Sequence, residues 1–353
     1  MSRRPSKFLI IDGVGGVPLG REIGEAFAER GIPTARLDAL KLPVRRFYEV
    51  RSAWHKFRNK LGEKNAFHNL PRLRFDVLEK RVVQEQPTHI LVVGFVYKHF
   101  DPAEVKRLAE AVGAQLMIYD TDSCNLYSKR REFIYFIEHE LPIYDLIFSF
   151  SKVTTRFFRD TLRLNALHLP FGAKQLPKEP GTLKQDVVFI GSADLRRVFL
   201  LEHVREWLSV RGARWARNFP LISVDLRKRI DDRPIWDDEL VSLLQSAKIV
   251  LNITRSDFYG AETGVNLRIF EALAAGCFLL TDYCEEVTEI FIPGVHLDVF
   301  RSASELRQKV EYYLAHPHER ERIAENGYNE FLAAHGWSSR VKQILAHTSV
   351  LGV

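Results

Sequence analysis

Residues 264–276 read Gly-Val-Asn-Leu-Arg-Ile-Phe-Glu-Ala-Leu-Ala-Ala-Gly, and residues 277–282 continue as Cys-Phe-Leu-Leu-Thr-Asp. Asn266 is well suited to cap a helix, and the apolar residues from Leu267 to Ala274 recur on one helical face. Gly276 can adopt the left-handed conformation that ends a helix, and the apolar run after it is typical of a buried parallel strand. This stretch therefore predicts a loop, a helix and a strand of an α/β fold.

The start of the predicted helix is a candidate binding site. It would present free backbone N–H groups and the positive end of the helix dipole to an anion. Glu271 lies near enough to the same end to reach a sugar hydroxyl beside a bound phosphate. The alternative is an ordinary helix–strand unit with a solvated glutamate, which is common in α/β proteins.

The pattern Asn-x-Arg-x-Phe-Glu-Ala, followed by small residues, a glycine and an apolar strand, resembles the donor-sugar motif of GT-B glycosyltransferases of the family 4 kind. It is most similar to the bacterial CgeB-like (spore-maturation-protein-like) group. The similarity covers roughly residues 186–345 and continues through Glu289–Gly294, Glu305–Leu306, Val310–Pro317 and Arg322–Gly327.

This resemblance implies a nucleotide-sugar donor of unknown nucleobase, bound by Asn266, Leu267, Arg268 and Glu271, with Glu271 on the ribose. In the family, a second acidic residue eight positions before the helix glutamate contacts the donor sugar. The chain has Thr263 there, with Glu262 one place away.

Composition sets broad limits. The chain has 353 residues, long enough for two domains, with 46% hydrophobic and 27% charged residues. Its three cysteines lack metal-ligand spacing and favour a reducing cytoplasm, and we expect no signal peptide and no transmembrane helix. The net charge of +6 favours anionic partners.

The first domain is expected over residues 1–170. Strand Phe8–Asp12 precedes a helix from Leu19 to Arg30, and the turn between them contains Gly13, Gly15 and Gly16, where a ligand could approach the backbone. The spacing is not a dinucleotide fingerprint, and no acidic residue follows a clear second strand. Further strands are expected at His89–Gly94, Gln115–Tyr119, Leu146–Phe150 and Ala166–Leu169, with helices at Leu73–Glu85, Pro102–Gly113, Lys129–His139 and Lys152–Leu162.

A helix between Pro43 and Gly62 departs from this alternation. Its apolar residues, Phe47, Val50, Trp54, Phe57 and Leu61, recur on one face, and residues 41–64 hold eight basic residues against two acidic ones. One interpretation is a helix whose apolar face packs in the core and whose basic back is solvated. The other is a basic amphipathic surface for an anionic membrane or acceptor. No nucleic-acid partner is expected, because no motif for one accompanies it.

Asp120 and Asp122 follow the strand that ends at Tyr119. Asp-x-Asp could hold a metal ion, but the spacing is common by chance. The resemblance instead implies a catalytic or acceptor-orienting role for this pair without metal, and capping of the next helix by Asp122 is the alternative.

A Pro- and Gly-rich stretch, residues 171–184, is the expected linker to a second domain at 185–337. Strand Asp186–Ile190, Gly191 and a long helix from Asp194 to Val210 repeat the start of the chain. Arg196 or Arg197 could clamp a diphosphate. Gly191, and Arg255 after the strand Ile249–Ile253, are further candidate donor-binding residues. Residues 338–353 are expected to return to the first domain.

Together these features predict a GT-B fold of two facing Rossmann-like domains with a cleft between them. The predicted activity is glycosyl transfer with retained configuration and with neither metal nor cofactor, by a cytoplasmic protein that touches the inner membrane face through residues 41–64. A nucleotide-binding structural protein and a nucleotide-sugar epimerase are the alternatives.

Overall fold

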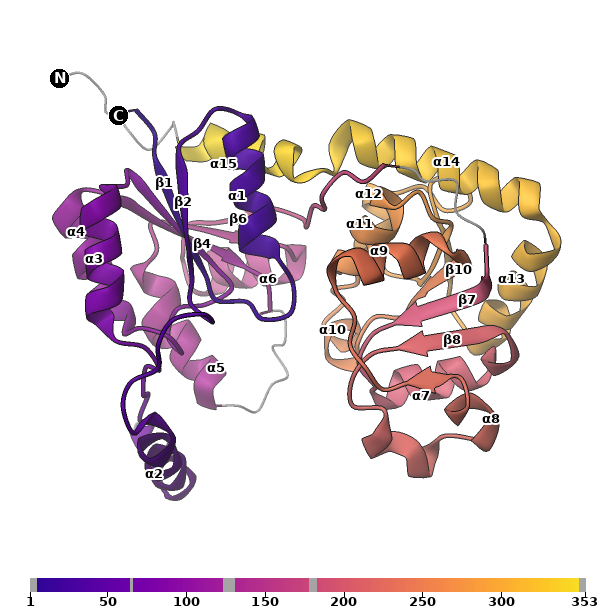
Figure 1. Ribbon diagram of the computed structural model, residues 1–353, viewed down its shortest axis with the longest axis horizontal. Coiled ribbons are helices and arrows are strands. Elements are labelled where there is room, and N and C mark those ends of the chain that lie inside the picture. The colour runs from indigo at the N-terminus through magenta and orange to yellow at the C-terminus, as the bar shows by residue number, and fades with distance from the viewer. Residues whose placement is uncertain (1–4, 64–65, 123–130, 178–182, 349–353) are drawn as a thin grey trace. The chain divides into compact units, whose positions relative to one another are not determined.

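A computed structural model describes residues 5–63, 66–122, 131–177 and 183–348 (Figure 1). The chain forms two compact units. Unit 1 contains the residues up to Pro170 together with those from Val341 onward, and unit 2 runs from Phe171 to Arg340.

Unit 1 is built on a parallel six-stranded sheet in the order β2-β1-β3-β4-β5-β6. Its strands are β1 (Phe8–Asp12), β2 (Thr34–Asp38), β3 (His89–Val93), β4 (Gln115–Asp120), β5 (Leu146–Ser149) and β6 (Ala166–His168). Its helices are α1 (Leu19–Glu29), α2 (Tyr48–Leu61), α3 (Phe75–Glu85), α4 (Pro102–Val112), α5 (Arg131–Tyr135) and α6 (Lys152–Arg156). π-helical segments, Phe136–Glu140 and Phe157–Thr161, continue α5 and α6.

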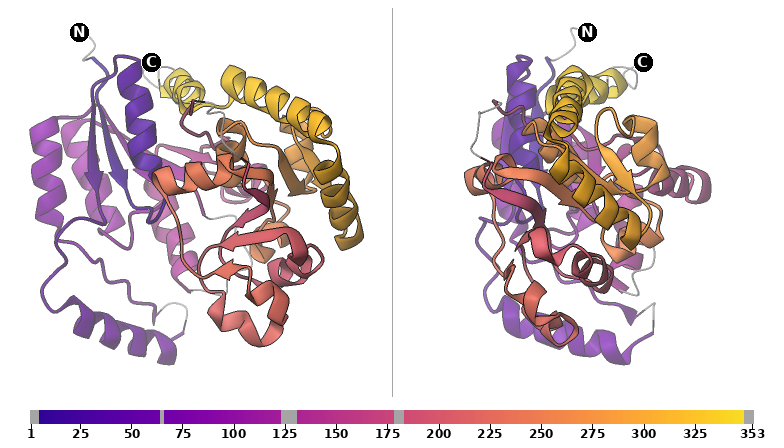
Figure 2. Two further views of the ribbon diagram at one scale, coloured as in Figure 1. Left: turned by 45° about the vertical axis from the view of Figure 1, so that its right-hand side comes forward. Right: turned by 90° about the vertical axis from the view of Figure 1, so that its right-hand side faces the viewer.

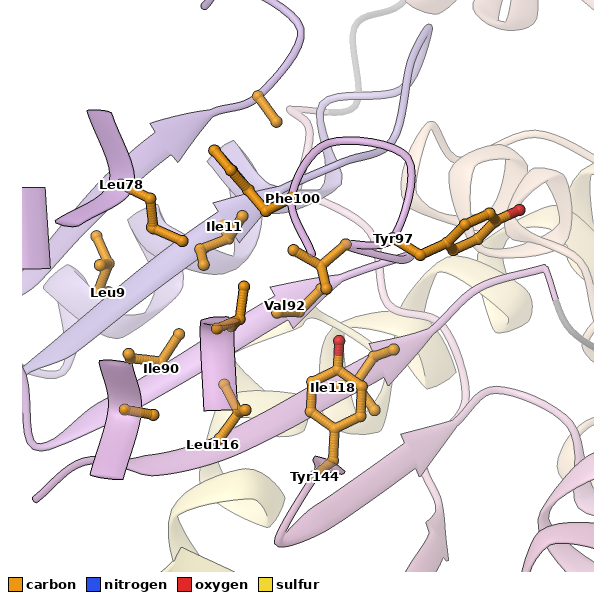
Figure 3. Packing of buried hydrophobic residues seen from close by; sticks show 14 of the residues in the cluster. Leu9, Ile11, Leu78, Ile90, Val92, Tyr97, Phe100, Leu116, Ile118 and Tyr144 are labelled. Atoms are coloured by element: carbon orange, nitrogen blue, oxygen red, sulfur yellow. The ribbon is translucent and has the colours of Figure 1, made fainter. Parts of the chain in front are cut away.

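Alternate side chains of β1 point to opposite faces of this sheet. Phe8 lies 4.3 Å, between ring centroids, from Phe27 of α1. Leu9 and Ile11 point to the other face, where they pack with Leu78 of α3 (Figure 3). All five β1 residues are buried, as expected for a strand covered by helices on both sides.

The strand β2, absent from the sequence prediction, is the main correction in unit 1. It pairs with β1 in parallel, with Phe8 opposite Thr34. Only Leu37 of its five residues is buried, because β2 is an edge strand, so its sequence lacks the apolar run of an inner strand. The predicted absence of an acidic residue after a second strand was also wrong, since β2 ends at Asp38.

Unit 2 has its own parallel six-stranded sheet, in the order β12-β11-β10-β7-β8-β9. The strands are β7 (Gln185–Ile190), β8 (Leu208–Arg211), β9 (Ile230–Asp231), β10 (Ala247–Asn252), β11 (Leu279–Asp282) and β12 (Asp298–Phe300). The helices are α7 (Leu195–Glu202), α8 (Val224–Arg227), α9 (Asp237–Gln245), α10 (Ser256–Gly260), α11 (Leu267–Ala274), α12 (Glu285–Ile290), α13 (Ala303–Ala315) and α14 (Pro317–Ala334). Helix α15 spans Trp337–Thr348.

The predicted helix from Asp194 to Val210 was too long. Helix α7 ends at Glu202, and Leu208–Arg211 forms β8, whose alternating burial places Leu208 and Val210 in the core. The two-residue strand β9 was not predicted either. In the expected linker, Phe171 and Ala173 are buried in unit 2, and residues 178–182 lie outside the described chain.

Strand order locates the ligand-binding edge of each sheet. In unit 1 the chain reverses direction across the sheet between β1 and β3, and in unit 2 between β7 and β10. Ligands of open α/β sheets bind at the carboxyl ends of strands beside such a switch point.

Candidate functional site

In unit 2 the loop after β7 brings two arginines to the carboxyl edge of the sheet. Asp194 caps α7 by accepting a hydrogen bond from the Arg197 backbone N–H at 3.0 Å. The Arg197 side chain is buried, and its guanidinium donates to the carbonyl oxygens of Ile253 and Ser192 at 2.7–2.9 Å. Burial lowers the pKa of Arg197 to about 10. Through these contacts Arg197 connects the loop after β7 to the loop after β10. Its guanidinium is occupied by these carbonyl oxygens, and a diphosphate contact by this residue stays a prediction.

The Arg196 side chain contacts residues at the carboxyl ends of β10 and β11. Its Nη1 donates to the Asp282 carboxylate at 2.7 Å and to the Thr254 carbonyl oxygen at 3.0 Å. The guanidinium carbon also lies 3.7 Å from the centre of the Tyr259 ring. Both hydrogen bonds come from Nη1, so Nε and Nη2 of Arg196 stay available, which leaves it better placed than Arg197 to bind an anion.

Asp282, at the end of β11, orders this edge and was not a predicted site residue. It is 2% exposed and accepts hydrogen bonds from the backbone N–H and the hydroxyl of Thr254 at 3.0–3.1 Å, besides that of Arg196. An acidic residue directly after a buried strand is the signal that could have identified it, because a buried carboxylate must be paired or hydrogen-bonded.

The loop before α11 is tied to the end of β11. The backbone N–H of Gly264 lies 3.2 Å from the Cys284 sulfur, and a Cβ atom at Gly264 would lie 2.4 Å from the Cβ of Cys284. Only glycine fits this approach. Thr263 is 1% exposed and donates its hydroxyl to the Phe258 carbonyl, whereas Glu262 is exposed.

At the start of α11 the predicted residues come together. The Asn266 side chain accepts a hydrogen bond from the Arg268 N–H at 3.1 Å, so it caps the helix. Arg268 Nη1 lies 2.6 Å from the Glu271 carboxylate. Burial raises the pKa of Glu271, and the Arg268 charge opposes that rise.

The Arg268–Glu271 contact is an ion pair without hydrogen-bond alignment. Nε and Nη1 of Arg268 are both buried, and neither has a hydrogen-bond partner among the residues that the structure describes. Buried donors without partners are costly, so a ligand acceptor here would recover hydrogen bonds. Leu267 is half-buried at the same end of α11, and Arg255 flanks the Phe258 ring at 4.2 Å just before α10.

In unit 1 the glycines after β1 lie at the carboxyl edge of its sheet. A Cβ atom at Gly13 would meet the Phe95 carbonyl oxygen at 2.5 Å, and Gly16 has a φ of 80°. Gly13 and Gly15 line a cavity described below. The turn is held by Asp12, whose carboxylate accepts from the Val14 N–H at 3.3 Å and whose pKa is raised by burial.

Asp120 and Asp122 differ in exposure. Asp120 is fully buried at the end of β4 and accepts a hydrogen bond from the Ser149 hydroxyl at 2.8 Å. Asp122 is exposed, and its backbone N–H lies 3.4 Å from the Asp120 carboxylate. Cys124, one of the three cysteines, and Lys129, where a helix was expected to begin, lie outside the described residues.

Helix α2 carries its apolar stripe on the outside. Phe47, Val50, Trp54, Phe57 and Leu61 are 54–76% exposed, so the interpretation that this face packs in the core was wrong. Figures 1 and 2 show α2 apart from the helices that cover the unit 1 sheet. A helix normally turns its apolar face inward, so this arrangement is reversed.

Polar contacts hold α2 to the rest of unit 1. The Asn59 side-chain amide exchanges two hydrogen bonds with the backbone of His68, at 2.7 and 3.1 Å. Arg131 of α5 donates to the carbonyl oxygens of Asn59 and Gly62. Just before the helix, the Arg45 guanidinium donates to the Leu73 carbonyl at 2.6 Å.

Beneath α2 lies a cavity of about 630 Å³. It is lined by three segments at the carboxyl edge of the unit 1 sheet (the glycine turn, residues 67–72 and residues 95–99) and by the inner face of α2. This volume falls in the range of small-molecule sites.

Two further findings concern metal ligands and membrane-spanning helices within the described part of the chain. Among the described residues, no group of three or more His, Cys, Asp or Glu side chains could hold a metal ion. Within the same residues, no helix is both long and apolar enough to cross a bilayer.

A family model matches most of unit 2 and the first residues after it. Residues 196–346, under half of the chain, match the family model described as glycosyl transferase-like. No curated protein matches the chain.

Solved structures of similar fold extend over the whole chain. Sucrose-phosphate synthase from Thermosynechococcus elongatus has a TM-score of 0.62 at 12% identity, over 98% of this chain and 99% of that one. HepE from Anabaena in complex with UDP-glucose has a TM-score of 0.61 at 12% identity, over 97% and 99%. An alpha-glucosyltransferase in complex with UDP and a 13-mer DNA has a TM-score of 0.64 at 12% identity, over the same shares. The predicted fold class is confirmed: the chain has the α/β fold of GT-B glycosyltransferases, with two Rossmann-like units.

Proposed function

We propose that the protein transfers a sugar from a nucleotide-sugar donor to a hydroxyl group of an acceptor. The observation that carries the proposal is the start of α11, where a helix end capped by Asn266 lies beside the Arg268–Glu271 ion pair, with buried guanidinium donors that make no hydrogen bond among the described residues. The glycosyl transferase-like match over residues 196–346 supports it, as do similar structures that hold UDP and UDP-glucose.

Each residue has a role that its chemistry allows. The donor diphosphate takes the N–H groups of Arg268 and the free donors of Arg196, and it benefits from the positive end of the helix dipole. Glu271 accepts hydrogen bonds from the ribose hydroxyls. In the transfer, the bond between the anomeric carbon and the diphosphate oxygen breaks. The acceptor oxygen bonds to that carbon, and the hydroxyl proton passes to a base or to water.

The finer points of the proposal come from the motif resemblance. The chain is a family 4 enzyme of the CgeB-like group that retains anomeric configuration. Arginine and helix-end donors stabilise the leaving diphosphate in place of a metal ion, and no cofactor is used. Asp122, the exposed member of the acidic pair, orients the acceptor or relays its proton, and Asp120 positions the turn that carries it.

One observation favours a second candidate, a nucleotide-binding protein without transfer activity. Thr263 stands where the family has an acid, and its buried hydroxyl is committed to the Phe258 carbonyl. Release of free nucleotide that depends on an added acceptor separates the two candidates.

A contact of residues 41–64 with an anionic membrane is part of the proposed glycosyltransferase function. The exposed stripe of α2 enters the interface of an anionic membrane, and the protein is peripheral at its inner face. Each nearby basic residue adds about 1 kcal/mol of attraction, so changing Arg51, Lys56 and Lys60 to Glu abolishes co-sedimentation with anionic vesicles. Equal sedimentation of the unmodified and triply changed proteins at low salt would contradict this contact.

The donor site is tested by calorimetry with UDP and UDP-glucose. Glu271→Ala removes charge-assisted hydrogen bonds worth roughly 1.5–3 kcal/mol, so donor affinity falls about 10- to 150-fold. Glu285→Ala, at an exposed position at the start of α12, is the matched control and leaves affinity unchanged. Unchanged affinity in a folded Glu271→Ala variant would remove Glu271 from the site. Turnover that stops with a chelator and returns with manganese would overturn metal independence.

A further inference from the structure

Helix α2 presents two opposite faces to two different environments. The side chains that line the cavity include Tyr48, Ser52, His55 and Asn59, which repeat every three or four residues and are half-buried. At about 100° per residue, they centre roughly half a turn away from the exposed stripe of Phe47, Val50, Trp54, Phe57 and Leu61. One helix therefore separates an apolar outer surface from a polar cavity.

The outer face has the composition of an interfacial helix. Its exposed stripe is accompanied by basic residues on α2 and just before it, namely Lys41, Arg46, Arg51, Arg58 and Lys60. Charge complementarity favours a surface of anionic lipid over a neutral protein partner. Because α2 is held by polar contacts from its inner face, the stripe can enter the lipid interface without detaching from unit 1.

The cavity combines aromatic walls with polar groups. Tyr48, Phe67, Phe95 and Tyr97 supply the aromatic surface. The charged side chains in its lining are Lys56, Arg72 and Lys98 against Glu49 and Glu132, a balance of one positive charge. Such a lining fits a negatively charged polar ligand.

One histidine in the cavity lining, His99, has a ring nitrogen that can accept a hydrogen bond from a hydroxyl group. His99 is 4% exposed, and its Nε2 lies 3.4 Å from the Gly13 carbonyl oxygen, which fixes Nε2 as the donor. Nδ1 is then an acceptor, and it has no hydrogen-bond partner among the described residues. Burial lowers the pKa of His99, which keeps the ring neutral near pH 7 and the Nδ1 lone pair available. His55 also lines the cavity, and its Nδ1 atom is likewise buried without a hydrogen-bond partner among the described residues.

From these contacts we infer that the cavity beneath α2 takes the hydroxyl-bearing, negatively charged head group of a membrane lipid, and that this lipid is the glycosyl acceptor. The inference rests on the proposed function. In the reaction, a head-group hydroxyl oxygen bonds to the anomeric carbon as the bond from that carbon to the diphosphate oxygen breaks. The lipid gains one sugar, and the nucleoside diphosphate and the hydroxyl proton are released.

The position of α2 favours a lipid over a free polyol phosphate as the source of this head group. A helix with its side chains is about 10–12 Å across, so a cavity on its inner face lies roughly one helix diameter from the lipid boundary that its outer face contacts. A cavity of about 630 Å³ accommodates a head group, while the acyl chains stay in the bilayer.

The experiment separates the two faces of α2. Co-sedimentation uses phosphatidylcholine vesicles with and without phosphatidylglycerol, and calorimetry uses two soluble compounds, glycerophosphoglycerol and inorganic phosphate. Ser52→Phe fills the cavity from the helix side, and Ala53→Phe adds the same ring at an exposed neighbouring position as the matched control. The double change Trp54→Ser and Phe57→Ser removes the centre of the stripe.

The unmodified protein sediments with the phosphatidylglycerol vesicles and binds glycerophosphoglycerol at least tenfold more tightly than inorganic phosphate. Ser52→Phe still sediments with the vesicles, but its affinity for glycerophosphoglycerol falls at least tenfold. Ala53→Phe sediments and binds glycerophosphoglycerol like the unmodified protein. The double serine variant no longer sediments with the vesicles but binds glycerophosphoglycerol as tightly as the unmodified protein.

Three results would overturn the inference: equal binding of the two soluble compounds, undiminished glycerophosphoglycerol affinity in Ser52→Phe, or undiminished sedimentation of the double serine variant. UDP binding, measured separately on each variant, reports the donor site alone. Its absence would remove the proposed function and leave the head-group result standing.

Discussion

The buried carboxyl of Glu140 should make the stability of unit 1 depend on pH near neutrality. Glu140 accepts hydrogen bonds from the backbone N–H groups of Val96 and Tyr97, each at 2.6 Å, and from the Tyr144 hydroxyl at 2.8 Å. It is fully buried, and burial raises its pKa to about 7 in spite of these donors. Tyr97 lines the cavity beneath α2, so Glu140 also fixes one wall of that cavity.

The magnitude follows from linkage. The folded pKa of about 7 stands against an ordinary value of 4.5, and each pKa unit corresponds to about 1.4 kcal/mol, which gives about 3.5 kcal/mol. A carboxyl with a raised pKa binds its proton more tightly in the folded state. Its stabilising contribution is therefore complete below pH 4.5, declines between pH 4.5 and 7, and is lost above pH 7.

Hydrogen exchange of the β3 and β4 backbone amides measures the unfolding free energy of unit 1 at pH 5 and pH 8. Between these values the Glu140 contribution should fall by about 2–3 kcal/mol. Glu140→Gln removes this part of the pH dependence, while Glu138→Gln, exposed on the same π-helical segment, keeps it. If Glu140→Gln and Glu138→Gln show the same pH dependence, Glu140 stays ionised throughout and the three donors outweigh burial.

Three further predictions concern other contacts. Arg197→Lys loses the aligned contacts to the Ile253 and Ser192 carbonyls and should destabilise unit 2 by about 2–3 kcal/mol in urea denaturation, more than Arg196→Lys does. Gly264→Ala should lower the melting temperature because its Cβ would overlap Cys284, and Cys284→Gly should restore it where Cys284→Ala does not. Phe47 has a φ of 57°, so Phe47→Gly should raise stability by about 0.5–1 kcal/mol while weakening vesicle binding; a loss of stability would show that the left-handed residue is not strained.

Strands with a continuous apolar run were predictable, and strands without one were not. The continuous apolar runs of β1 and β3 indicated strands within a residue of their observed ends. Strands β2, β8 and β9 are only partly buried, so their sequences carry no continuous apolar run that distinguishes them from loop or helix. The periodicity of an apolar face predicted α2 well, but periodicity cannot show whether that face meets a core or the outside.

Some candidate site residues could also be predicted from the sequence, and others could not. Local motifs identified Asn266, Arg268 and Glu271, because a helix cap and its first turns lie close together in the sequence. The different contacts of Arg196 and Arg197 could not be predicted from their adjacency, since Arg197 donates to the Ile253 carbonyl whereas Arg196 pairs with the Asp282 carboxylate. The cavity beneath α2 is formed by segments spread from Gly13 to Glu132, and only the folded sheet brings them together.

The division of the chain into units also has a consequence for synthesis on the ribosome. Unit 2 is one continuous segment, whereas unit 1 is completed by residues from Val341 onward. Val341 and Ile344 of α15 are buried, and His347 lies 6.5 Å, between ring centroids, from Phe148 of β5. Domains usually fold as they emerge, the N-terminal one first. Here the N-terminal unit is translated first but receives its last helix only after all of unit 2 has been made. A nascent chain stopped at residue 340 should therefore hold a finished unit 2 and a protease-sensitive unit 1.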